Sequence, residues 1–203
     1  FTPFISPLIP SIFKVAGYEM ETLPISDECS CDWGLKYSNN EVCYPATLIV
    51  GDIVKAFKEG RYDPDNTCVA ITQTGGQCRA SNYISLIKKA LIENGYTHTP
   101  ILSIAFGSGI DNQQPGFKVN WLKVLPIALA AVLYSDCIAK FYYAAVVREK
   151  KPGQAAKLKD MYLEAAKPLI LKNRPEDLLS YLSLAVDEFN QITGFTNVSY
   201  KSG

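Results

Sequence analysis

Residues 69–82 read Val-Ala-Ile-Thr-Gln-Thr-Gly-Gly-Gln-Cys-Arg-Ala-Ser-Asn, and this stretch decides the predicted fold. Val69–Thr72 is a short apolar, partly β-branched run, which is typical of a buried strand. The Gly75-Gly76 pair predicts a turn, and the Ser-Asn pair that closes the stretch can cap a following helix. Cys78 then lies close to the helix N-terminus, where partial positive charge favours the thiolate over the thiol. The stretch therefore predicts a strand, a chemically active loop and a helix in succession.

Similar patterns alternate on both sides of this stretch. Strands are expected at Tyr18–Leu23, Thr67–Gln73 and Pro100–Phe106, and helices at Pro7–Gly17, Pro45–Lys58 and Ser81–Asn94. Ile25–Tyr37 is expected to be a loop. Repeated alternation with short connections predicts an α/β fold, a flavodoxin- or Rossmann-like parallel sheet with helices on both faces. The functional edge of such a sheet lies at the carboxyl ends of its strands.

A helical extension follows from Val119. Trp121–Val147 is strongly apolar, but charged residues interrupt it, and its longest uncharged run, Val124–Ser135, is shorter than the ~20 residues that a bilayer requires. We therefore expect buried helices and no membrane span. Two amphipathic helices are expected after it, at Gln154–Leu171 and Glu176–Thr193. The predicted domains are an α/β cysteine-bearing domain at 1–118 and a helical extension at 119–203.

Composition narrows the classes of partner and the compartment. The 203 residues are 48% hydrophobic, with 20 basic and 20 acidic side chains and no basic stripe, so nucleic acid is a poor partner. The six cysteines lie among patterns that need no disulfides, and no signal peptide is visible, which favours the reducing cytoplasm. Phe1–Phe4 resembles the exit of a strand, so we expect the chain to be a piece of a longer protein.

The cysteines are the main candidates for chemistry. Cys43 and Cys78 each stand in a loop that starts a helix, and thiolates at converging loops suit zinc or an iron–sulfur cluster. Two buried structural thiols would explain the pattern equally well. The pair Cys29 and Cys31 could supply a further ligand or form a disulfide. Cys68 and Cys137 are expected to be packed core thiols.

Other chemistries fit the sequence less well. A Cys–His dyad needs His98, the only histidine, but the helix expected between it and Cys78 spans 14 residues, roughly 21 Å. The Gly75-Gly76 turn could cradle a phosphate, with Arg79 pairing with an anion such as a CoA phosphate, although the Walker lysine is absent. Three amides close to the sulfurs, of Asn39, Asn40 and Asn82, could equally serve in turns and helix capping.

Four motifs stand together in the first 118 residues: Gly34-Leu35-Lys36-Tyr37-x-Asn39-Asn40-x-x-Cys43-Tyr44-Pro45-Ala46, Gln73-Thr74-Gly75-Gly76-x-Cys78-Arg79-Ala80-x-Asn82-Tyr83, Lys89-Ala90-Leu91 and Pro115-Gly116-Phe117-Lys118. Together they resemble the acyl-CoA dehydratase activase-related proteins, which are relatives of the 2-hydroxyacyl-CoA (2-hydroxyglutaryl-CoA) dehydratase subunits of anaerobic metabolism.

The resemblance implies flavodoxin-like domains that bind a [4Fe–4S] cluster through three cysteines, for low-potential electron transfer or radical dehydration of acyl-CoA thioesters. Cys43 and Cys78 match the first two ligands, and the third belongs to a later α/β domain. Gly75 and Gly76 would let the backbone approach the cluster. Second-layer or substrate-facing groups would be Asn39, Asn40, Arg79 and Asn82.

The implied partners are an ATPase activase module, a further α/β domain and acyl-CoA. Any lyase activity would then belong to the full-length protein, and no catalytic residue is assigned. The alternative is a metal-free scaffold or docking domain of the same protein. In that case Trp121–Val147 would form an interface with other domains or with a second copy, giving a homodimer.

Overall fold

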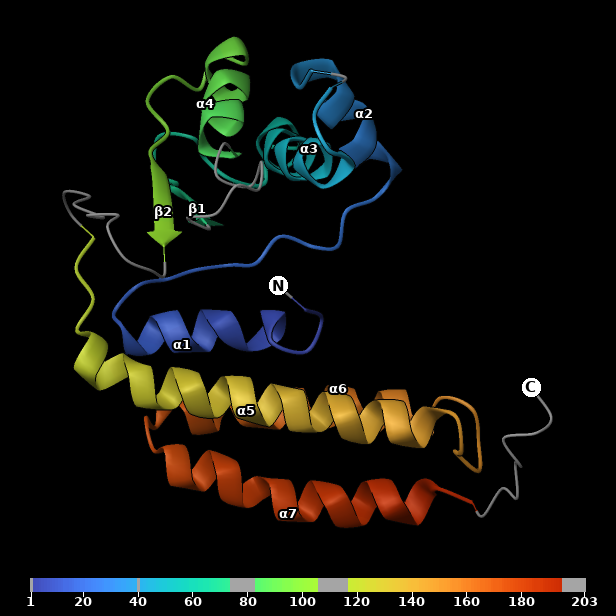
Figure 1. Ribbon diagram of the computed structural model, residues 1–203. Coiled ribbons are helices and arrows are strands. Elements are labelled where there is room, and N and C mark those ends of the chain that lie inside the picture. Colours follow the sequence, from blue (N-terminus) through green and yellow to red (C-terminus); the bar gives the residue numbers. More distant parts are fainter. Residues whose placement is uncertain (1, 40, 74–82, 106–116, 195–203) are drawn as a thin grey trace. The chain divides into compact units, whose positions relative to one another are not determined.

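The computed structural model describes residues 2–39, 41–73, 83–105 and 117–194, and it divides into two compact units. A helical unit comprises Phe1–Thr22 and Lys118–Gly203, and an α/β unit comprises Leu23–Phe117. The elements in chain order (Figure 1) are the 3-10 helix η1 (Ser6–Leu8), α1 (Ile9–Val15), α2 (Glu28–Tyr37), α3 (Tyr44–Lys58), β1 (Val69–Gln73), α4 (Tyr83–Glu93), β2 (Ile101–Ala105), α5 (Trp121–Val146), α6 (Gln154–Leu171) and α7 (Pro175–Ile192).

In the helical unit, α5 packs against α6 and α7, and α1 packs against α6. The core is apolar along one side of each helix and includes Ile127, Ile138 and Ile170, all fully buried. Tyr134 is also fully buried, and its hydroxyl donates a hydrogen bond to the carbonyl of Tyr162 at 2.9 Å. This bond satisfies the polar atom inside the core and fixes α5 against α6.

The start of α6 is fixed by a carboxylate. Both oxygens of Glu149 accept hydrogen bonds, from the backbone N–H of Gly153 at 2.7 Å and from that of Ala155 at 2.8 Å. These N–H groups have no partner inside the helix, so the carboxylate caps it, and they lower the pKa of Glu149. Gly153 has φ 88°, a left-handed conformation that glycine adopts without strain.

In the α/β unit, β1 and β2 pair in parallel, with Val69 opposite Ile101 and Gln73 opposite Ala105. Helices α3 and α4 pack together through Val50, Val54 and Leu91, and apolar residues of the two strands join the same core. Helix α2 lies along α3. At their crossing a Cβ added to Gly51 would overlap the carbonyl oxygen of Ser30, and one added to Gly34 would overlap that of Thr47.

The predicted flavodoxin- or Rossmann-like sheet with helices on both faces is wrong. The protein is mostly helical, and the described residues contain a sheet of two strands only. Tyr18–Leu23 has no regular secondary structure and lies outside the two-stranded sheet of the described residues, because alternation alone does not supply the neighbouring backbone that a strand needs.

Two further expectations for the N-terminal part differ from the structure. The expected loop Ile25–Tyr37 contains α2, which begins at a capping box formed by Asp27 and Ser30. Phe4 does not leave a strand: it is buried in the core of the helical unit, beside Tyr142. The helices and strands expected between residues 45 and 106 and after residue 119 are present, with ends shifted by a few residues at most.

Candidate functional site

Cys43 stands at the N-cap position of α3, at the end of the turn that follows α2. Pro45, in the first turn, suits this helix start because its missing N–H would have no partner there. The Cys43 side chain caps nothing and is exposed. Its sulfur lies 3.9 Å from the hydroxyl oxygen of Tyr83, the first residue of α4. The structure therefore places a thiol, free of any disulfide, beside the N-terminus of a second helix.

Cys78 lies outside the described residues, but the strand before its segment and the helix after it are described. The segment leaves the carboxyl end of β1 at Gln73 and enters α4 at Tyr83. Tyr83 is five positions after Cys78 in the chain, so their Cα atoms are at most about 17 Å apart. Since Tyr83 contacts Cys43, this chain length permits the two sulfurs to meet at one site.

The structural elements that position Cys43 differ from those that the sequence predicted. Cys43 does not follow a strand; it lies in a connection between two helices. Its neighbour is the helix that follows β1, and the contact joins residues 40 positions apart. Sequence reasoning could not identify Tyr83 as the neighbour, because no local pattern reports a tertiary contact.

Of the predicted polar groups around the sulfurs, the structure describes Asn39. It is exposed, and its side-chain oxygen accepts a hydrogen bond from the backbone N–H of Glu41 at 3.4 Å, which is a turn-forming role. The remaining predicted site residues, Asn40, Gly75, Gly76, Arg79 and Asn82, lie outside the described residues.

Cys29 and Cys31 lie on α2, not in a loop, and point in different directions. Two positions on a helix are about 200° apart, so these thiols do not face each other. Cys29 interacts electrostatically with Lys55, whereas Cys31 is hydrogen-bonded to the hydroxyl of Tyr44. This hydrogen bond, together with the charge of Cys31, raises the pKa of Tyr44. Cys31 therefore faces the start of α3, where Cys43 stands, and Cys29 does not.

The structure also tests the predictions for Cys68, Cys137 and His98. Cys68 is exposed at the beginning of β1, so its expected place in the core is wrong, although partial burial raises the pKa of its thiol. Cys137 is half-buried on α5. His98 is exposed in the turn before β2, as the sequence predicted.

The described residues fit only part of a cluster site. Nowhere in the described part of the chain do three or more histidine, cysteine or acidic side chains come together as a metal site. Of the two predicted ligands, the structure places Cys43, with Cys31 turned toward the same helix start. The donor chemistry suits iron or zinc, but the number of donors falls short of a complete site.

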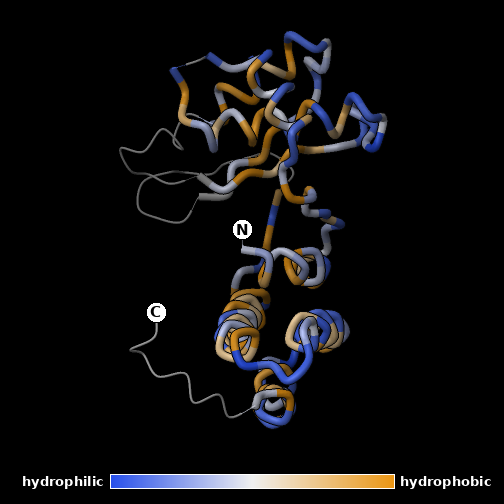
Figure 2. Tube along the Cα trace, turned by 90° about the vertical axis from the view of Figure 1, so that its right-hand side faces the viewer, coloured by the Kyte–Doolittle hydropathy of each residue, from blue (hydrophilic) through white to orange (hydrophobic). Residues whose placement is uncertain are grey.

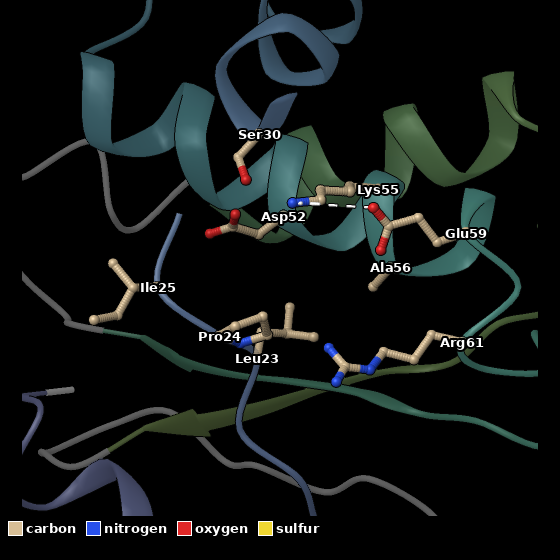
Figure 3. A pocket seen from close by; sticks show the side chains of 9 residues that line it. All are labelled: Leu23, Pro24, Ile25, Ser30, Asp52, Lys55, Ala56, Glu59 and Arg61. Carbon is tan, nitrogen blue, oxygen red and sulfur yellow. Dashed lines mark ion pairs between the residues drawn. The ribbon is translucent and has the colours of Figure 1, made fainter. Parts of the chain in front are cut away.

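A small hollow lies elsewhere in the α/β unit, between Leu23–Ile25 and helix α3 (Figure 3). Its volume is about 30 Å³, room for only a few water molecules. Lys55 forms ion pairs there with Asp27 and Glu59, and Ser26 donates a hydrogen bond to Asp52 at 2.6 Å. These groups already satisfy one another, and the space is too small for an acyl-CoA.

Comparisons of this chain with protein-family models, with curated proteins and with solved structures find no match.

Proposed function

We propose that the α/β unit supplies Cys43 and Cys78 as thiolate ligands to an iron–sulfur cluster, in the manner of the dehydratase and activase-related proteins that its motifs resemble. When bound, such a cluster supplies low-potential electron transfer or radical dehydration of an acyl-CoA thioester. The partners in this proposal are an ATPase activase module and a further α/β domain, and the compartment is the reducing cytoplasm.

One observation carries the proposal. The exposed Cys43 thiol at the start of α3 contacts Tyr83, the residue at which the Cys78 segment enters α4. This contact supports convergence of the two cysteine loops without the large sheet that the sequence suggested. The Tyr83 hydroxyl, 3.9 Å from the sulfur, is placed to donate a hydrogen bond to a ligating thiolate.

The structure also favours one of the two further cysteines as an additional ligand. Cys31 is directed toward Tyr44 at the start of α3, whereas Cys29 lies near Lys55. We therefore assign Cys31 as the ligand that this chain itself would add. The polar groups of Asn39, Asn40, Arg79 and Asn82, with the backbone of Gly75 and Gly76, would surround the cluster.

The test is anaerobic reconstitution of the full chain with ferrous iron and sulfide, followed by absorption spectroscopy and iron analysis. The wild-type chain is expected to develop the broad brown absorption of a cluster. Cys43→Ala and Cys78→Ala should each lose most of it, because each removes a thiolate ligand. Cys31→Ala should lose iron as well, and Cys29→Ala should not.

Cys68→Ala and Cys137→Ala are the matched controls, since they remove thiols from the beginning of β1 and from the other unit. Both should reconstitute like the wild type. An identical cluster in wild type, Cys43→Ala and Cys78→Ala would exclude the assignment.

A metal-free docking domain is the second candidate function, and a specific observation favours it. Helix α5 exposes large apolar side chains on the surface of its unit, among them Leu122, Leu129 and Leu133. Figure 2 shows the helices of this unit nearly end-on, with hydrophobic and hydrophilic positions both present in the bundle. Iron and sulfide analysis of the anaerobically purified chain separates the two candidates: a docking domain contains neither element.

A further inference from the structure

Helix α5 is apolar on two opposite sides. One side is the core side, where Ile127, Ala131 and Ile138 are fully buried. The other is an exposed stripe at spacings of three and four residues, with Leu125, Leu129, Val132 and Leu133 in its first half and Tyr143 and Val147 at its end. These spacings keep the exposed residues on one face of the helix. A second apolar face of this kind needs a partner of its own.

Two charges stand in the middle of this exposed stripe. Asp136 and Lys140 are exposed, four residues apart, and therefore on the same face as the leucines. No ion pair or hydrogen bond joins either side chain to another described residue. The stripe thus carries one negative and one positive charge, each without a partner inside the described part of the chain.

The position of the charges argues against lipid as the occupant. Helix α5 is long and apolar enough to cross a membrane by length and composition, and 39% of its most apolar window is buried inside the protein. In a span, however, Asp136 and Lys140 would face lipid from the outer side of the unit, close to the middle of the helix. Ionised side chains in that place are costly, and they normally face a protein interior or an aqueous cavity.

We propose that the exposed stripe of α5 binds the same stripe of a second copy of this chain, with the two helices antiparallel. A twofold axis between positions 136 and 140 places Asp136 of each copy opposite Lys140 of the other. The same register sets Leu133 against Tyr143 and Leu129 against Val147, in both halves of the contact. Such a contact is self-complementary, as a twofold interface must be.

The charges also select the direction of packing. In a parallel pair each Asp136 would meet the other Asp136, and the two lysines would likewise meet, so like charges would repel. The antiparallel pair replaces both repulsions by two attractions. This interface belongs to the helical unit and does not involve the cysteines, so it holds or fails independently of the proposed iron–sulfur site.

The decisive experiment is charge reversal in the full chain, with oligomeric state measured by sedimentation velocity. Asp136→Lys leaves two lysines on the stripe, and Lys140→Asp leaves two aspartates. Each variant alone should dissociate at least about tenfold more readily than the wild type. An equimolar mixture of the two should restore a 1:1 dimer, because lysines of one copy then face aspartates of the other. This rescue also shows that both variants are folded.

The apolar part of the stripe is tested by Leu129→Glu, which should weaken the dimer about tenfold or more by placing a charge in the contact. The matched control is Leu184→Glu on α7. Leu184 is 53% exposed and Leu129 is 56% exposed, so the two substitutions add the same charge at equally exposed leucines. The control should leave the dimer unchanged.

Three results would overturn the proposal. The first is a wild-type chain that stays monomeric at about 100 µM, a concentration at which even a weak specific dimer is populated. The second is a dimer that neither charge reversal nor Leu129→Glu affects. The third is flotation of a monomeric chain with neutral phospholipid vesicles, strengthened by Asp136→Leu, which would assign the stripe to lipid.

Discussion

Asp27 ties two helices of the α/β unit together. Its carboxylate accepts a hydrogen bond from the backbone N–H of Ser30 at 2.9 Å, capping α2, and forms an ion pair with Lys55 of α3. The bond with Lys55 and the bonds with Ser30 lower the pKa of Asp27 from 3.8 to about 2. A carboxyl group whose pKa is lower in the folded than in the unfolded protein stabilises the folded state at pH values above its unfolded pKa. This stabilisation is lost as the pH falls through the folded pKa.

The Asp27→Asn variant tests this linkage. Asparagine still caps a helix but carries no charge, so the variant should be less stable than the wild type at about pH 5. The difference should shrink as the pH falls toward about 2, where Asp27 itself becomes protonated. Urea unfolding of both proteins across this range measures it. A difference that stays constant with pH would show that the Lys55 ion pair contributes nothing.

At the scale of elements, the crossing of α2 and α3 depends on two glycines. Gly51 faces the carbonyl oxygen of Ser30, and Gly34 faces that of Thr47, with no room for a Cβ in either place. A glycine inside a helix normally costs stability, so its presence here reflects the close approach of the two backbones. Because Cys31 and Cys43 lie on these two helices, this approach also fixes their relative positions.

Gly51→Ala should therefore destabilise the protein, although alanine is the better helix former. The expected loss is about 1–3 kcal/mol or more, because backbone must move to admit the methyl group. Chemical denaturation of the full chain measures the loss. Leu35→Ala, an exposed position beside Gly34, is the control and should change stability little. A stabilising Gly51→Ala would show that the helices are not in close contact.

At the scale of the whole molecule, the chain forms two hydrophobic cores. One joins α1 with α5, α6 and α7, and the other joins α3 and α4 with the two strands. The chain enters the α/β unit after Thr22 and leaves it before Lys118, so the helical unit is assembled from both ends of the sequence. Separate cores predict that damage to one unit leaves the other protected from hydrogen exchange.

Tyr134→Phe tests this prediction in the full chain. It removes the hydroxyl that bonds to the carbonyl of Tyr162 inside the helical core, at an expected cost of about 1 kcal/mol. Hydrogen exchange followed by mass spectrometry should show faster exchange in peptides from 2–22 and 118–194 and no change in 23–105. Leu184→Met, a conservative substitution at a 53% exposed leucine of the same unit, is the control. Equal acceleration in both units would contradict the division.

Local sequence was sufficient for most of the helices and for both strands. Pro45 at a helix start, Gly60 after a helix end and the spacing of Ile49, Ile53 and Phe57 act over a few residues, so α3 was predictable nearly to its ends. Helix α2 was not predicted, because the acidic, cysteine-bearing composition of its stretch is typical of loops, although Asp27 stands at a possible N-cap position.

The sequence by itself determined most of the helices and the two described strands, because periodicity, proline, glycine and caps act through neighbouring residues. Only the tertiary structure decided that Tyr18–Leu23 lies outside the sheet of the described residues, that the first residues join the helical core, and that Cys43 lies beside Tyr83. These three outcomes depend on which distant segments meet. That choice is set by the packing of whole surfaces, and no short stretch of sequence contains it.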